Sequence, residues 1–255
     1  MSTRIAPMHI RPMRISAISL DLDDTLWPIE PVMLRAEQRL DAWLKTHCPR
    51  AAEHYPIPAM RALRDQVAGE NPHLAHDFTA QRRLSLSAAL TPHGYGDDHV
   101  ESAFTEFYAA RNQVECYADA LPALERLAAL FPLVSLTNGN ADLHKIGLSR
   151  FFQFSICARD FGAAKPAPQI FHSACDRLGL PPDAVLHVGD DPEQDVAGAR
   201  AAGLRCAWLN RGQAAWRHPQ SPNLIVPDLI VRDLSELADA LAALAVNENA
   251  SSALA

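Results

Sequence analysis

Short apolar runs that stop abruptly at polar or acidic residues constrain the fold of this chain more than any other feature. Residues 14–22 form a β-prone run that stops at carboxylates, residues 133–136 stop at Thr137-Asn138-Gly139, and residues 184–188 stop at Gly189-Asp190-Asp191. Each run is followed by a helix-like stretch. Strands that alternate with helices indicate βαβ units and a parallel sheet, in which all strands end along one edge. The chain is therefore predicted to be an α/β protein that carries these polar residues at the ligand-binding edge of its sheet.

The segment 31–113 differs, because it shows helical periodicity and no convincing strand. Its helical stretches fall at 34–43, 60–67, 78–90 and 100–110, separated by proline and glycine. We therefore predict a core over 13–30 and 114–246, a helical insertion over 31–113, and tails at 1–12 and 247–255, the second of them disordered. Further core strands are expected at 152–157 and 205–209, and core helices at 118–130, 169–178, 195–202 and 234–244.

Composition narrows the possible partners. The 255 residues are 48% hydrophobic, which allows a substantial core, and the formal net charge of −7 argues against a general attraction to nucleic acid or to an anionic membrane. No run approaches the ~20 apolar residues that span a bilayer. The five cysteines form no C-x-x-C pair, which suits a reducing compartment. The expected protein is cytoplasmic, a monomer or a small homo-oligomer, and its partner is a small molecule.

Asp21 and Asp23 lie two positions apart where the first apolar run ends. The two-residue period of an extended chain directs both side chains toward the same side. Such a pair can divide the work of phosphoryl transfer, because one carboxylate can attack phosphorus while the other protonates the leaving oxygen and then activates water. The alternative for an Asp-rich strand end is turn formation and capping of the next helix.

A second acidic segment, residues 189–195, follows the third apolar run and is expected at the same sheet edge as Asp21. The negative charge gathered there requires a cation. Mg²⁺ is the expected one, because it prefers hard oxygen ligands and bridges carboxylates to phosphate. Asp21 and Asp190 are the predicted side-chain ligands, whereas Asp191, with Gln194 three positions on, is predicted to cap the next helix.

Lys165 stands in a rigid, proline-rich loop of a chain that has only three lysines and otherwise uses arginine. A compact ammonium suits a phosphate oxygen and a neighbouring carboxylate, and a solvated loop lysine is the alternative. Thr137 and Asn138 offer a hydroxyl and backbone N–H groups for phosphate oxygens. Asn140 is predicted to cap the following helix, and His187 to be a hydrogen-bonded core residue.

Four short motifs, in this order along the chain, resemble those of the haloacid dehalogenase-like superfamily. They are Asp21-Leu-Asp23-Asp-Thr25, Thr137-Asn138-Gly139, Lys165-Pro166, and Gly189-Asp190 with Asp195. The resemblance covers nearly the whole core. It implies a Rossmann-like core of parallel strands flanked by helices, a helical cap inserted after the first motif, and Mg²⁺ as cofactor.

The resemblance also implies a role for each motif residue. Asp21 would be the nucleophile and a metal ligand, and Asp23 the general acid/base, which also offers its backbone carbonyl to the metal. Asp190 would complete the protein ligands. The phosphoryl group would be held by Lys165, Thr137 and Asn138, with Thr25 and Asp195 in supporting positions.

More narrowly, residues 14–26, 132–140 and 186–191 look like bacterial phosphatases acting on flavin mononucleotide and on 5-amino-6-(5-phospho-D-ribitylamino)uracil, with a weaker likeness at 76–79 and Arg82. The acidic residue at position 23 favours phosphate-ester hydrolysis, because the dehalogenase branch carries none there. A small phosphorylated metabolite is thus the expected substrate. The open alternatives are a broad-specificity or phosphoglycolate-type phosphatase, a haloacid dehalogenase, and a non-catalytic binding module.

Overall fold

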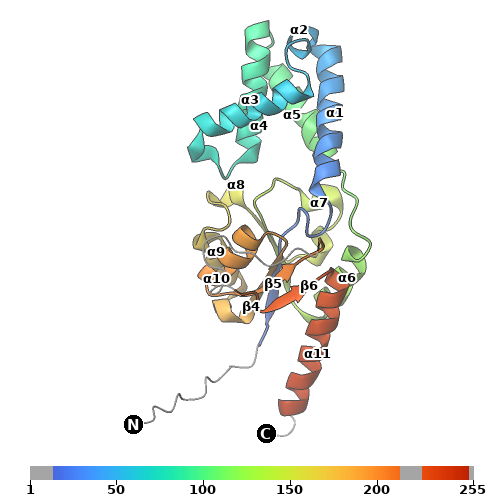
Figure 1. Cartoon of the computed structure of the whole chain (residues 1–255), viewed down its shortest axis with the longest axis vertical. Helices are drawn as coiled ribbons and strands as arrows, with labels where there is room; N and C mark the ends of the chain where they lie inside the picture. Colours follow the sequence, from blue (N-terminus) through green and yellow to red (C-terminus); the bar gives the residue numbers. More distant parts are fainter. Residues whose placement is uncertain (1–13, 213–225, 253–255) are drawn as a thin grey trace.

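A six-stranded parallel sheet forms the centre of the protein (Figure 1). The computed structural model describes residues 14–212 and 226–252, with the backbone alone over 245–252. The strand order is β3-β2-β1-β4-β5-β6, so the first strand lies in the middle of the sheet. The strands are β1 (Ala17–Leu20), β2 (Leu133–Thr137), β3 (Ser155–Cys157), β4 (Val185–Gly189), β5 (Arg205–Leu209) and β6 (Leu229–Val231). The predicted α/β fold with a Rossmann-like parallel sheet is confirmed.

Both faces of the central strands are covered, because successive side chains of strands such as β4 and β5 enter different apolar clusters. Leu186 and Val188 of β4 pack with Leu124 and Leu237 on one face, whereas Val185 packs with the opposite cluster. The first face is covered by α6 (Ala120–Leu130), α7 (Leu143–Ile146) and α11 (Leu234–Ser252). The second is covered by α9 (Pro168–Leu178) and α10 (Gly198–Ala201), with α8 (Ala158–Phe161) following β3. This arrangement fixes the register, since a one-residue slip would exchange the two faces.

Five helices that follow β1 form a separate bundle with its own apolar cluster, which includes Leu40, Leu86 and Phe107. They are α1 (Ile29–His47), α2 (Pro49–Ala52), α3 (Ile57–Glu70), α4 (Phe78–Leu90) and α5 (Asp97–Arg111). Figure 1 shows this helical bundle stacked on one end of the α/β core. The four helical stretches predicted between residues 34 and 110 all fall within these helices, and α4 has the predicted bounds.

The structure differs from the sequence predictions at several places. The edge strand β6 was not predicted, because only three residues form it. The helix expected at 195–202 begins with a π-helical turn, Pro192–Ala197, before α10. The final helix α11 continues to Ser252, so the tail predicted from 247 is helical over most of its length, since extending an existing helix costs little. Residues 1–12 lie outside the described part of the chain.

Asp142, and not Asn140, caps the helix α7. The Asp142 carboxylate accepts hydrogen bonds from the backbone N–H groups of His144 and Lys145. The chain extends two residues further than the sequence suggested before it turns into the helix, so Asn140 instead donates a 3.3 Å hydrogen bond to the Thr79 hydroxyl in the helical bundle. The remaining short helical turns are 3₁₀ turns at 72–74, 91–93, 149–151 and 182–184. Among the described residues, no helix is both long and apolar enough to cross a membrane.

Candidate active site

Three neighbouring strands deliver the predicted site residues to one edge of the sheet. Asp21 follows β1 directly, Thr137 ends β2, and Asp190 follows β4. β1 pairs in parallel with both β2 and β4, so all three strands end at the same edge. The backbone N–H of Asp21 donates a 2.9 Å hydrogen bond to the carbonyl of Val188, which extends the ladder to the nucleophile candidate itself. The common sheet edge for these residues, predicted from the alternation of strands and helices, is confirmed.

A buried ammonium lies between two carboxylates at this edge. The Nζ atom of Lys165 is 2.6 Å from Oδ1 of Asp21 and 2.6 Å from Oδ1 of Asp195. The Lys165 side chain is only 2% exposed, so the alternative of a solvated loop lysine is wrong. Charge-assisted hydrogen bonds of this length fix the positions of all three side chains.

Burial and neighbouring charge oppose each other in this triad. Burial raises the pKa of Asp21 well above its usual value, although Lys165 partly counteracts this. Burial would also raise the pKa of Asp195, but Lys165 and His187 hold it below the usual range. Burial alone would lower the pKa of Lys165, yet the two carboxylates raise it, so the ammonium stays charged.

Both carboxylate oxygens of Asp195 have hydrogen-bond partners in addition to Lys165. His187 Nε2 lies 3.0 Å from its Oδ1, and His187 Nδ1 lies 3.0 Å from the hydroxyl of Ser19 on β1. The backbone N–H of Asp191 donates to Oδ2 of Asp195 at 3.0 Å. The prediction that His187 is a hydrogen-bonded core residue is therefore confirmed. Burial lowers the pKa of His187. Gly189 allows this packing, because a Cβ atom there would collide with the carboxyl group of Asp195.

Three carboxylates form a candidate metal site. Oxygen atoms of Asp21, Asp190 and Asp195 all lie within 4.8 Å of one another. A set of hard oxygen donors of this kind fits Mg²⁺, which prefers carboxylates and keeps several waters. Thr25 donates a 3.3 Å hydrogen bond to Oδ1 of Asp190. Burial, assisted by the charge of Asp195, raises the pKa of Asp190 to about 7.

The Asp23 carboxylate is separate from this cluster and is held by groups that the sequence analysis did not single out. Trp27 Nε1 donates to Oδ1 of Asp23 at 2.8 Å, and Arg111 Nη2 donates to both carboxylate oxygens, at 2.8 and 2.6 Å. Arg111 is 2% exposed and lies at the end of α5, so the helical bundle contributes directly to the site. Its position in the last turn of the last bundle helix was the only available signal. The predicted metal contact of Asp23 through its backbone carbonyl stays a prediction.

Asn138 secures the loop that carries Lys165. Its side-chain oxygen accepts from the backbone N–H of Lys165 at 2.8 Å, and its side-chain nitrogen donates to the Lys165 carbonyl at 2.9 Å and to Gln194 at 2.7 Å. The Asn138 side chain is thus occupied, and only its backbone N–H group could serve a phosphate. The hydroxyl of Thr137 accepts a 3.0 Å hydrogen bond from the N–H of Gly139. Asp191 caps the following helical turn and is contacted by Gln194 at 3.1 Å, as predicted.

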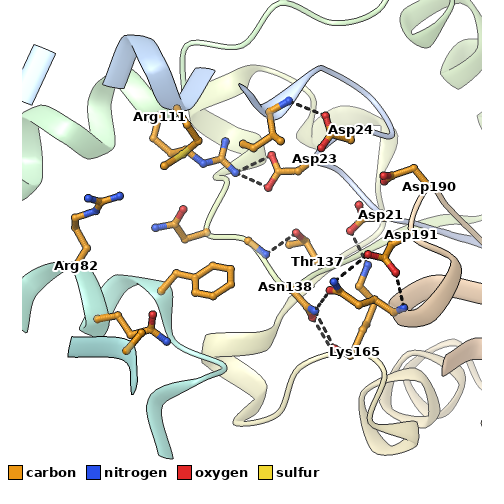
Figure 2. Close-up of a pocket in the computed structure, with 18 of the residues that line it drawn as sticks. Asp21, Asp23, Asp24, Arg82, Arg111, Thr137, Asn138, Lys165, Asp190 and Asp191 are labelled. Carbon is orange, nitrogen blue, oxygen red and sulfur yellow. Dashed lines mark hydrogen bonds and ion pairs between the residues drawn. The ribbon is translucent and has the colours of Figure 1, made fainter. Parts of the chain in front are cut away.

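These side chains line a cavity of about 530 Å³ between the sheet edge and the helical bundle. Figure 2 shows Asp21, Asp190 and Lys165 at one side of it and Arg82, from α4, at the other. The bundle also contributes apolar side chains, including Phe78 and Phe107. A cavity of this size accommodates a small metabolite rather than a lone phosphate ion.

The fold and this constellation define an enzyme core of the Rossmann-like α/β class, with an acidic site at the carboxyl ends of its strands. Residues 15–203 match the family model described as hydrolase, haloacid dehalogenase-like hydrolase. The chain belongs to the haloacid dehalogenase-like hydrolase family.

Several known proteins are similar to this chain. The 5-amino-6-(5-phospho-D-ribitylamino)uracil phosphatase YigB of Escherichia coli (strain K12) is 33% identical over 204 residues, which cover 78% of this chain and 85% of that protein. The phosphoserine phosphatase of Thermus thermophilus is 35% identical over 63% of this chain and 66% of its own length. A solved structure named 2-haloacid dehalogenase, from Pseudomonas syringae pv. Tomato DC3000, superposes with a TM-score of 0.82 at 37% identity, over 89% of this chain and 98% of that one.

Proposed function

We propose that this protein is a Mg²⁺-dependent phosphatase that hydrolyses a small phosphorylated metabolite through an aspartyl-phosphate on Asp21. The observation that carries the proposal is the buried group of Asp21, Lys165 and Asp195, with Asp190 beside it, at the end of a 530 Å³ cavity. A carboxylate next to a buried ammonium is placed to attack phosphorus while the positive charge stabilises the phosphoryl oxygens.

The proposed reaction has two steps. An oxygen of Asp21 attacks phosphorus, the bond from phosphorus to the leaving oxygen breaks, and Asp23 gives that oxygen a proton. Asp23 then takes a proton from water, whose oxygen attacks phosphorus and breaks the bond to Asp21, so that inorganic phosphate is released. Trp27 and Arg111 hold the Asp23 carboxylate at the cavity wall for this exchange.

Further residues of the chain bind the phosphoryl group or support the site. Lys165 neutralises charge on its oxygens, and the Thr137 hydroxyl and the Asn138 backbone N–H donate to them. Asp21, Asp190 and the backbone carbonyl of Asp23 would hold Mg²⁺, which would supply further charge neutralisation and orient the phosphate. Thr25 and Asp195 support these ligands.

The helical bundle, residues 31–113, is proposed to be a cap domain on a core made of 13–30 and 114–246. The apolar clusters of bundle and core support this division, because each is internally packed. The cavity lies between the two parts, so closure of the bundle would exclude bulk water from the reaction. Regions of this kind set substrate choice, while the core carries the chemistry.

Flavin mononucleotide and 5-amino-6-(5-phospho-D-ribitylamino)uracil are the proposed substrates, a broad-specificity or phosphoglycolate-type activity being the alternative. The similarity to YigB over 78% of this chain supports the second of these two compounds, which is the one that the name of YigB gives. Dehalogenation is the second candidate, suggested by the Pseudomonas syringae structure at 37% identity. Asp23 argues against it, because halide leaves without a proton, and an assay for halide release from a 2-haloacid separates the two activities.

The test is a comparison of Asp21→Asn with wild type on a panel of phosphate esters. Asp21→Asn should lower kcat/KM by at least about 1,000-fold, because loss of a nucleophile removes most of the chemical step. Asp183→Asn, an exposed change remote from the cavity, is the control and should leave turnover unchanged. A chelator should abolish activity, Mg²⁺ should restore it, and Ca²⁺ should substitute poorly. Turnover by Asp21→Asn near the wild-type rate would exclude the proposed nucleophile.

A further inference from the structure

Arg82 is a buried cation at the end of the cavity opposite the carboxylates (Figure 2). Its side chain belongs to α4, and the residue is only 4% exposed. The guanidinium carbon lies 4.1 Å from the centre of the Phe107 ring. Among the described residues, Arg82 has no hydrogen bond or ion pair with a carboxylate, although Glu37 and Asp65 lie near enough to act on it electrostatically.

The other arginines near the cavity are paired. Arg111 binds Asp23, Arg64 contacts Asp65 at 2.9 Å, and both lie in the cavity wall. The neighbour of Arg82 in sequence, Arg83, stacks over Phe104 at 3.9 Å but also binds Glu101 through two hydrogen bonds, at 2.8 and 2.9 Å. Arg82 thus differs from its neighbour because it makes no hydrogen bond or ion pair with a carboxylate, even though it is more deeply buried.

Burying a charged group that makes no hydrogen bond or ion pair with a carboxylate costs free energy. A ring face compensates only part of the lost hydration. Burial lowers the pKa of Arg82 to about 10, so it remains protonated at neutral pH. Arg82 lines the same cavity whose far end is proposed to receive the phosphoryl group. A ligand oxygen in that cavity would accept hydrogen bonds from the Arg82 guanidinium.

We infer that Arg82 determines substrate specificity by binding hydrogen-bond acceptor oxygens on the part of the substrate that leaves after phosphoryl transfer. The inference rests on the proposed phosphatase function for the other end of the molecule. A planar fork of donors suits a carboxylate or the carbonyl oxygens of a flat heterocycle, and the nearby rings of Phe78 and Phe107 suit a flat heterocycle as well.

The test uses two pairs of phosphate esters that differ in these oxygens. Flavin mononucleotide is compared with ribitol 5-phosphate, which lacks the ring carbonyls, and phosphoglycolate with ethyl phosphate, which lacks the carboxylate. Wild type should prefer the acceptor-bearing ester in at least one pair. Arg82→Met should lower kcat/KM for that ester by about 10- to 100-fold, the range for losing hydrogen bonds to a charged group, mainly through KM. For the matched ester, which lacks these oxygens, kcat/KM should change less than about 3-fold. The pair that is affected shows whether Arg82 binds ring carbonyls or a carboxylate.

Arg83→Met is the matched control, because it removes an adjacent arginine that also stacks on a phenylalanine but faces away from the cavity to bind Glu101. Arg83→Met should leave the ratio of kcat/KM values within each pair of esters unchanged. Arg82→Lys retains the charge without the fork and should lose several-fold of the preference, which provides a second variant if Arg82→Met does not fold. An equal loss for both members of a pair, or an unchanged preference in Arg82→Lys, would overturn the inference while leaving the phosphatase proposal intact. Wild type that shows no preference for the acceptor-bearing ester in either pair would also overturn the inference, whereas the phosphatase proposal is tested separately by Asp21→Asn.

Discussion

Replacement of Lys165 by methionine should destabilise the folded protein severely, whatever its effect on activity. Lys165 contacts Asp21 and Asp195 at 2.6 Å each. At an effective dielectric constant of about 20, each contact contributes about 6 kcal/mol before desolvation is counted. Removal of the ammonium also removes its desolvation cost, and the carboxylates can take up a proton. The expected net loss is therefore about 3–5 kcal/mol in the free energy of unfolding, as for other buried pairs that lose one partner.

The measurement is urea denaturation at neutral pH in the presence of a chelator, so that no divalent cation replaces the ammonium. Lys145→Met is the control, because Lys145 is exposed, and it should change stability by less than about 0.5 kcal/mol. The double variant Lys165→Met/Asp195→Asn should be about 1–3 kcal/mol more stable than additivity predicts, because one unpaired carboxylate is neutralised. A Lys165→Met variant as stable as wild type, or strictly additive effects in the cycle, would refute the argument.

The remaining predictions concern the same sheet edge. Burial raises the pKa of Asp190 to about 7, so the metal-free folded protein keeps a proton that the unfolded chain releases near pH 4. The free energy of unfolding should therefore fall as pH rises from about 4 to about 7. Asp190→Asn should flatten this dependence in urea titrations with a chelator. Equal slopes of the free energy of unfolding against pH for wild type and variant would disprove the assignment to Asp190. Gly189→Ala should cost about 1–3 kcal/mol, because its Cβ atom would lie 2.7 Å from that of Asp195. Gly69→Ala in α3, where the added carbon would meet no atom within 4 Å outside its own stretch of helix, should instead be neutral or stabilising. Thermal melts of both variants measure this difference, and similar losses at both glycines would count against the close-contact explanation.

The residues that the sequence placed correctly are those attached to strand ends. Asp21, Thr137 and Asp190 could be assigned to one sheet edge from the alternation of strands and helices, because a parallel sheet aligns all its carboxyl ends. The cap formed by Asp191 was equally predictable, since a capping box involves only neighbouring residues.

The contacts that were not predicted from the sequence depend on tertiary packing. Arg111 reaches Asp23 across 88 positions of the chain, and nothing in its local sequence distinguishes it from other helix-terminal arginines. His187 could be assigned to the core but not to the support of Asp195, because that contact requires the turn at 192–197 to fold back over β4. The cap of α7 was predicted at Asn140 but lies at Asp142, because the path of the loop before the helix depends on the assembled structure.

The central position of β1 has a consequence for how the protein is made on the ribosome. β1 is synthesised first of the six strands, yet both of its neighbours come from much later in the chain: Ile18 pairs with Leu133 on one side and with Leu186 on the other. Both pairings of β1 close long loops, and such pairings form slowly. An apolar strand with two open edges must therefore await the emergence of its partners. A nascent chain that ends before β4 lacks Asp190 and Asp195, so the acidic cluster can assemble only after that strand has been synthesised.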